Sequence, residues 1–185
     1  GESRLLNPAT NLSMNPKLAF IITTVSIKGP IACVDGGTGK PEKLWNYRRP
    51  GVDHLQRATL GDFDPSRPGL ELVAVGKRQI RGGLVLWSAE EDHLWHKDIP
   101  AGWVTWGDWN GDRNPEILLS GGIGGQNGFE VWTGSGKRLY ALAGTGATPM
   151  GVESAGPLRP DLDGNGKADL LLWTRRGYML LLEAP

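Results

Sequence analysis

The sequence predicts an all-β protein, and composition and patterning are the first two observations that favour this fold class. The chain has 185 residues, of which 28 are glycine and 13 are proline. Such a composition is unusual for a helical bundle. The segments between these residues are rich in Val, Ile, Leu and Trp, which is typical of strands. No window of about a dozen residues shows an apolar helical stripe without Gly or Pro, so we expect helices only as short connectors.

The expected strands are short apolar segments, and turn residues separate nearly all of them. In chain order they are Leu18–Ile27, Ile31–Asp35, Lys43–Tyr47, Leu70–Gly76, Gly83–Ser88, His93–Lys97, Trp103–Gly107, Glu116–Ser120, Gly128–Thr133, Arg138–Leu142, Ala168–Thr174 and Tyr178–Glu183. The first is an apolar run of roughly half the length that a membrane-spanning helix needs. We therefore interpret it as a buried strand.

The third observation is an internal repeat. Three acidic segments align, and they are GDFDPSRPGLELV (61–73), GDWNGDRNPEILL (107–119) and PDLDGNGKADLLL (160–172). Their first aspartates, Asp62, Asp108 and Asp161, are 46 and 53 residues apart. After each loop come an apolar strand, a Gly-containing turn and a second strand. A period of this size is typical of propeller blades, so we expect a β-propeller or a part of one, with about four units of four antiparallel strands.

The repeat also predicts how the chain is divided. We expect residues 1–14 to form an N-terminal extension or a strand clasp, and residues 15–185 to form units at approximately 15–60, 61–106, 107–159 and 160–185. The last unit shows only two strands. Four units are few for a closed ring, so either the extension completes the last unit, or open sheet edges pair with a second copy or a protein partner.

Oxygen-bearing side chains recur at alternate positions of the acidic loops, which predicts calcium sites. Positions one, three, five and nine offer side-chain oxygens and position seven a backbone carbonyl, and hard oxygen ligands in this number suit Ca²⁺. The expected ligands are Asp108, Asn110, Asp112, Asn114 and Glu116 in one loop, and Asp161, Asp163, Asn165, Lys167 and Asp169 in another. Such an ion would have a structural role. Gly111 and Gly164 permit the sharp turn that converging ligands require.

The first acidic loop departs from this pattern. Asp62, Asp64 and Ser66 keep the spacing, but Pro65 replaces the glycine and Glu71 comes one residue late. We expect weaker metal binding there, or none.

Two alternatives apply to these loops. An EF-hand requires a bidentate Glu at position twelve between two helices, and Leu119 or Leu172 stands there in an expected strand, so we exclude it. The other alternative is that the aspartates only close turns through hydrogen bonds to their own backbone. This alternative stays open, although two full copies at matching positions favour calcium.

These loops, with the strands that follow them, resemble FG-GAP or VCBS repeats over roughly residues 15–185. The resemblance implies calcium-stabilised blades in an extracellular, periplasmic or cell-surface protein. Within this class, GDFDPSRPGLELVAVG, GLVLWSAEEDHLWHKD and GDWNGDRNPEILL are most similar to the propeller of rhamnogalacturonan lyases, which cleave acidic pectin by β-elimination. The catalytic domain of those enzymes is far longer than this chain, so their catalytic positions are not carried over.

A lyase activity would need a base and cations that neutralise the uronate. His54, with Arg48, Arg49 and Arg57 nearby, is the candidate base. The alternative is a solvated surface of mixed charge. Similarly, Trp103, Trp106 and Trp109 are candidates for stacking on sugar rings, but we favour packing in the core and expect Trp109 to be the most exposed.

Several classes of function find no support. The 20 basic and 20 acidic residues balance, so charge gives no case for a nucleic-acid partner. Cys33, the single cysteine, forms neither an internal disulfide nor a zinc cluster. No apolar run suits a membrane span. The sequence therefore predicts a non-catalytic, calcium-stabilised propeller module that binds a protein or a saccharide, with a fragment of a polysaccharide lyase acting on acidic polysaccharide as the alternative.

Overall fold

The computed structural model describes residues 19–23, 31–45, 55–76, 83–90, 92–99, 103–112, 114–120, 128–142, 149–153, 164–165, 169–174 and 179–183. All regular secondary structure in these ranges is β-strand, so the all-β prediction is confirmed. Within the same ranges, there is no helix of the length and apolar character that a membrane crossing requires.

The strands form four antiparallel sheets, each built from consecutive strands, and no sheet closes on itself. The first sheet contains β1 (Ala19–Thr23), β2 (Ile31–Asp35) and β3 (Pro41–Trp45). The second contains β4 (Leu55–Gly61), β5 (Glu71–Gly76), β6 (Leu84–Trp87) and β7 (His93–Lys97). The third contains β8 (Trp103–Gly107), β9 (Glu116–Ser120), β10 (Phe129–Trp132) and β11 (Arg138–Leu142). The fourth contains β12 (Pro149–Glu153), β13 (Asp169–Thr174) and β14 (Met179–Glu183).

Two of these strands, β4 and β12, were not among the expected ones. The β4 sequence, LQRATLG, has polar residues in its first half, and β12, PMGVE, contains Pro and Gly, so neither has a strong strand signal. The fourth sheet accordingly has three strands and not the two that the sequence shows. The weak strand propensity of β4 and β12 is compensated by pairing with the strongly apolar strands β5 and β13.

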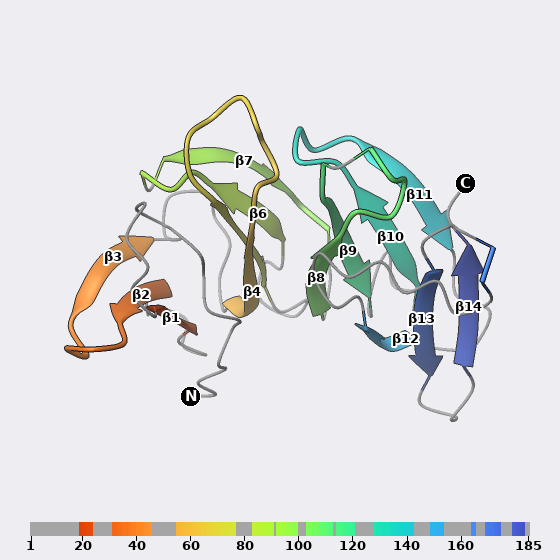
Figure 1. Ribbon diagram of the computed structural model, residues 1–185, viewed down its shortest axis with the longest axis horizontal. Helices are drawn as coiled ribbons and strands as arrows, with labels where there is room; N and C mark the ends of the chain where they lie inside the picture. Colours follow the sequence, from red (N-terminus) through yellow and green to blue (C-terminus); the bar gives the residue numbers. More distant parts are fainter. Residues whose placement is uncertain are drawn as a thin grey trace.

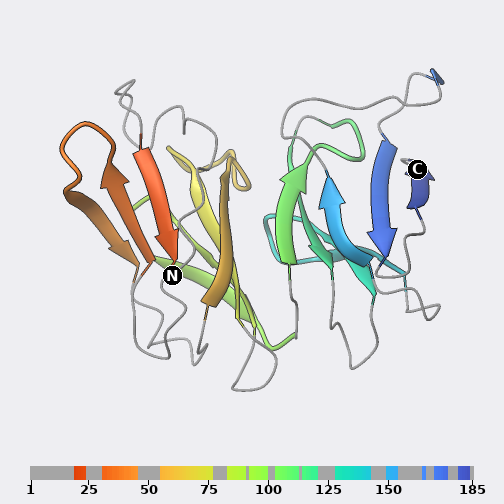
Figure 2. The ribbon, with the colours of Figure 1, turned by 90° about the horizontal axis from the view of Figure 1, so that it is seen from below.

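The sheets follow one another across the molecule in chain order, from β1–β3 at one end to β12–β14 at the other (Figure 1). The opening strands lie side by side, with β4 next to both β1 and β8, and β12 next to β8 (Figure 2). The sheets are therefore stacked through their faces, with the opening strand of each along a common line.

Apolar side chains fill the space between the first and second sheets and between the second and third. Successive residues of a strand point to opposite faces. In β5, Leu72 and Ala74 join a cluster with the first sheet, whereas Val73 and Val75 join a cluster with the third. Every residue of β5, β6, β9 and β10 is buried, so the two middle sheets are covered on both faces. Cys33 is buried in the first cluster as a free thiol.

Candidate functional site

The second acidic loop joins β8 to β9, and the residues at its two ends pair with each other across these strands. Gly107 at the end of β8 pairs with Glu116 at the start of β9. The intervening tip carries the exposed residues Asn110, Asp112 and Asn114. Glu116, by contrast, is only 2% exposed, so a carboxylate is held inside the protein at the base of the loop.

Glu116 closes the loop through its backbone. Its Oε2 accepts hydrogen bonds from the backbone N–H groups of Trp109 (2.7 Å) and Asn110 (3.5 Å). Burial raises the pKa of the Glu116 carboxyl, these hydrogen bonds oppose the shift, and the charges of Asp112 and Asp108 raise it further. The loop therefore holds two acidic side chains close enough to Glu116 to disfavour its ionisation.

Side chains at the tip bond to the backbone of the same loop. Asp108 Oδ1 accepts from the N–H of Gly111 at 2.8 Å, Asn110 Oδ1 from that of Asp112 at 2.8 Å, and Asp112 Oδ1 from that of Asn114 at 2.7 Å. Gly111 has a φ of 83°, where a side chain would be strained. These hydrogen bonds close turns within the loop. Such turns are the alternative to calcium binding that the sequence analysis did not exclude.

The same arrangement recurs in the first acidic loop, between β4 and β5. Gly61 pairs with Glu71, and Glu71 Oε2 accepts from the backbone N–H groups of Phe63 (2.9 Å) and Asp64 (3.0 Å). Glu71 is fully buried, and its Oε1 has no hydrogen-bond partner among the described residues. We call this contact, a buried glutamate at the start of a second strand that binds two amides of the preceding loop, the glutamate clamp.

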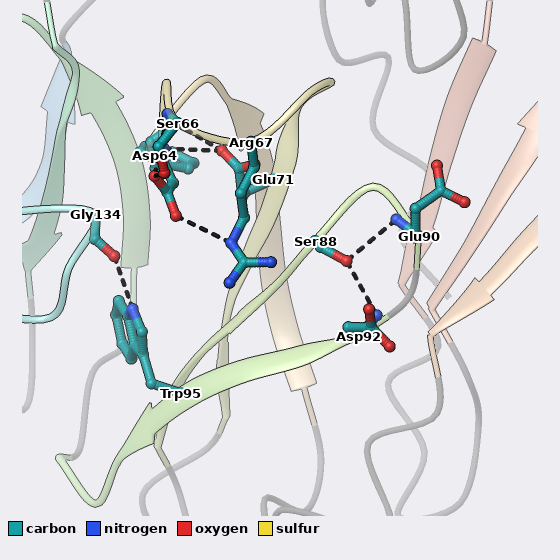
Figure 3. A network of polar contacts seen from close by, with 10 residues as sticks. Asp64, Ser66, Arg67, Glu71, Ser88, Glu90, Asp92, Trp95 and Gly134 are labelled. Carbon is teal, nitrogen blue, oxygen red and sulfur yellow. Dashed lines mark hydrogen bonds and ion pairs between the residues drawn. The ribbon is translucent and has the colours of Figure 1, made fainter.

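The tip of the first loop differs from that of the second, because an arginine neutralises it (Figure 3). Arg67 Nε lies 3.0 Å from Asp64 Oδ2, and the Ser66 hydroxyl donates to Asp64 Oδ1 at 2.5 Å. The Ser66 hydroxyl, followed by the Ser66 amide and Arg67, lowers the pKa of Asp64. A guanidinium thus pairs with Asp64, one of the predicted calcium ligands of this loop.

The third acidic loop falls mostly outside the described residues. Asp161, Asp163 and Lys167 are not among them, whereas Asn165 is exposed. Asp169 opens β13 and is buried, as Glu71 opens β5 and Glu116 opens β9. A buried acid therefore begins the second strand of the second, third and fourth sheets.

The described part of the chain contains no group of three His, Cys, Asp or Glu side chains that could hold a metal ion. The predicted calcium set of the second loop also draws on Asn110 and on the carbonyl of Asn114. Its donors are all hard oxygens, and Asn110 Nδ2 lies 3.2 Å from Asp112 Oδ2, so two of these side chains meet at the tip. The donor chemistry fits Ca²⁺ in the second loop, and calcium stays a prediction.

The clamp of the first loop also touches the next sheet. A Cβ added at Gly134, in the turn between β10 and β11, would lie 1.8 Å from the carbonyl oxygen of Phe63. The same Gly134 accepts a 2.7 Å hydrogen bond from Trp95 Nε1 on β7 (Figure 3). The equivalent contact between the first two sheets is a 3.1 Å bond from Trp45 Nε1 on β3 to the carbonyl of Ser88.

The remaining sequence candidates are placed only in part. Arg48, Arg49 and His54 lie outside the described residues, and Arg57 is half-buried on β4. No contact between these four residues is described, and the lyase alternative stays a hypothesis.

Two of the three tryptophan candidates lie in or beside the core. Trp106 is half-buried against the cluster between the second and third sheets. The expectation that Trp109 is the most exposed was wrong, because it is only 6% exposed and packs edge-on against Tyr140, with ring centroids 5.5 Å apart. Nothing is described of the Trp103 side chain, which lies on β8.

Comparison with protein-family models, curated proteins and solved structures finds no match to this chain. The resemblance to FG-GAP or VCBS repeats and to rhamnogalacturonan lyases therefore depends on the sequence motifs alone. Sequence reasoning found Glu71 and Glu116 by their spacing, but it missed their bonds to backbone amides and the pairing of Arg67 with Asp64.

Proposed function

We propose that this chain is a calcium-stabilised module of the β-propeller type that serves in binding or assembly and is not catalytic by itself. The observation that carries the proposal is the glutamate clamp, which occurs at the same place in two consecutive sheets. A buried acid at this position accepts hydrogen bonds from the preceding loop and so attaches that loop to its sheet.

The arrangement of the sheets supports a propeller. Each sheet is a meander of consecutive strands, the opening strands lie along a common line, and neighbouring sheets pack face to face. These are features of blades around an axis. Ring closure is part of the proposal.

The electrostatics of the second loop support calcium. Asp108 and Asp112 both oppose the ionisation of Glu116, so three carboxylates repel one another at one loop. Bound calcium would supply the opposing charge there. In the first loop Arg67 already supplies a positive charge, so we propose that the second loop binds calcium more tightly than the first.

The roles of the acids support a structural function over catalysis. Glu71 and Glu116 each use one oxygen to bind two backbone amides, which leaves that oxygen committed to holding the loop. General acid or base chemistry would instead require a carboxyl within reach of a substrate proton.

Thermal melting with calcium or with a chelator tests this proposal. A ligand that binds only the folded protein stabilises it by about 2.7 kcal/mol at a hundredfold excess over its Kd. For a chain of this size, that corresponds to a rise in midpoint of about 5–10 °C. We expect Asp112→Asn to reduce this rise strongly, and Asp64→Asn, in the arginine-neutralised loop, to leave most of it. Equal midpoints with calcium and with chelator would contradict the proposal.

A further inference from the structure

Two exposed histidines lie close together on β7, the last strand of the second sheet (Figure 1). The ring centroids of His93 and His96 are 6.0 Å apart, and the rings are tilted by 45°, so they are not stacked on each other. Residues three apart on a regular strand point to opposite faces of the sheet. The proximity of these two rings therefore requires a departure from regular strand geometry.

A β-bulge in β7 supplies this departure. The register pairs His96 with Val85. It pairs His93 with Trp87, so the two residues between the histidines oppose a single residue of β6. Val85 and Trp87 are two apart on β6 and share a face, and each histidine lies on the same face as its paired residue. The extra residue thus brings both histidines to one face, and bulges at sheet edges often re-aim side chains next to functional sites.

Both imidazoles have ring nitrogens available for a ligand. Within the part of the chain that the structure describes, no hydrogen bond or ion pair joins either ring to another residue. In the same part, β7 pairs only with β6 and forms an edge of its sheet. The pair is therefore accessible from solvent and is not engaged in holding the fold together.

The separation of the rings suits one shared metal ion. An imidazole nitrogen lies about 2.0–2.1 Å from the zinc that it binds, which puts the ring centre roughly 3.2 Å from the metal. Two rings on one ion therefore have centres roughly 5.2 Å apart at the tetrahedral angle and at most roughly 6.4 Å apart. The observed 6.0 Å lies between these two values.

The donor type indicates which metals fit. Imidazole nitrogen suits zinc, copper and nickel, whereas calcium takes oxygen ligands. No third His, Cys, Asp or Glu among the described residues completes a metal-holding group with this pair. The other coordination positions of a bound ion are therefore left to water or to a ligand from outside the described chain.

We propose that His93 and His96 form a surface site for a divalent transition-metal ion of the copper and zinc type. One nitrogen of each imidazole binds the ion, and the remaining coordination positions are open. This inference goes beyond the proposed function and does not depend on it, because it involves neither the acidic loops nor calcium.

Calorimetric titration of the full chain with Cu²⁺, with electron paramagnetic resonance on the same samples, tests the inference. Excess Ca²⁺ is present throughout, so that the acidic loops do not take up the probe. We expect a single Cu²⁺ site whose spectrum shows coupling to two imidazole nitrogens. His93→Gln or His96→Gln should weaken binding at least about tenfold, because the second imidazole no longer binds at high effective concentration. His54→Gln is the matched control, since it removes the third histidine of the chain.

The outcomes separate this inference from the proposed function. Absence of Cu²⁺ binding by the wild type, unchanged binding in His93→Gln and His96→Gln, or equal weakening by His54→Gln would overturn the inference. Substitutions at exposed positions rarely affect folding, and melting in chelator verifies that each variant is folded. Asp112→Asn, which tests the calcium site, should leave Cu²⁺ affinity unchanged. Loss of the calcium response with intact Cu²⁺ binding therefore contradicts only the proposed function.

Discussion

Glu116 is both a candidate calcium ligand and a hydrogen-bond acceptor that holds its loop in place. Its replacement by alanine leaves the buried amide of Trp109 without an acceptor. An unsatisfied buried donor costs about 1–3 kcal/mol. We therefore expect Glu116→Ala to lower the free energy of unfolding by about 2 kcal/mol in urea titrations with chelator present. Glu90→Ala, at an exposed residue beside Lys43, is the control and should change it by less than about 0.5 kcal/mol.

The pH dependence of stability tests the burial of Glu71. Burial is the largest cause that raises its pKa, with Asp62 and Asp64 adding to it. A carboxyl whose folded pKa lies above its unfolded pKa contributes stability below the unfolded pKa, and this contribution is lost as pH rises through the folded pKa. Glu71→Gln removes the titration but keeps an acceptor oxygen. With chelator present, the stability of this variant relative to wild type should therefore increase from pH 4 to pH 7, and a constant difference would contradict the assignment.

Spacing in the sequence predicted the acids at these loops but not what they bind. The acids were found because oxygen-bearing residues alternate over Asp108–Glu116, and alternation is visible in a sequence. The bonds to the amides of Trp109 and Phe63 depend on the path of the loop backbone, which spacing does not determine. The pairing of Arg67 with Asp64 depends on a basic side chain that the pattern of oxygen-bearing residues does not include.

Between neighbouring elements, the turn that joins β10 to β11 has a strict steric requirement. A Cβ at Gly134 would overlap the backbone carbonyl of Phe63, so Gly134→Ala forces the turn away from the second sheet. Overpacking of this kind costs about 1–3 kcal/mol, measured as a loss in unfolding free energy. Gly37→Ala is the control, because its Cβ would meet only Asp35 Oδ1 at 3.4 Å, an ordinary contact distance. Similar losses in both variants would contradict this role for Gly134.

The indole bond of Trp95 joins the second and third sheets, and it provides a milder test of the same junction. Trp95→Phe keeps an aromatic ring but removes the N–H that donates to the Gly134 carbonyl. A single hydrogen bond contributes about 1 kcal/mol, so we expect a loss of that size in unfolding free energy. In the Gly134→Ala background the same substitution should cost less, because the turn has already moved. Full additivity in this double-mutant cycle would contradict the coupling.

Strand prediction succeeded where packing and local preference agree. Five strands, including β2 and β9, have the expected bounds, because apolar and β-branched residues there coincide with turn residues at both ends. The opening strands β4 and β12 were missed because their sequences are weakly apolar and they form by pairing with stronger neighbours. Their absence also hid the meander order, in which a strand precedes each acidic loop.

For the molecule as a whole, the repeat period predicted stacked β-units, and the structure shows sheets of consecutive strands in chain order. The repeat period does not determine how many sheets complete the stack. Each sheet only requires a neighbouring sheet on each of its faces, whatever the total number. The burial pattern of β2 shows only that its two faces differ, with Ile31, Cys33 and Asp35 buried and Ala32 and Val34 half-buried.

Phe63 has a consequence for how this molecule melts. Its backbone N–H donates a hydrogen bond to Glu71 in the second sheet, and its carbonyl lies close to Gly134 in the third sheet. One residue therefore links the two sheets. In linear arrays, nearest-neighbour coupling of this kind makes adjacent units unfold together. A scanning calorimeter should therefore record these two sheets as one endotherm. Ordering of the first acidic loop would then also make the third sheet more rigid.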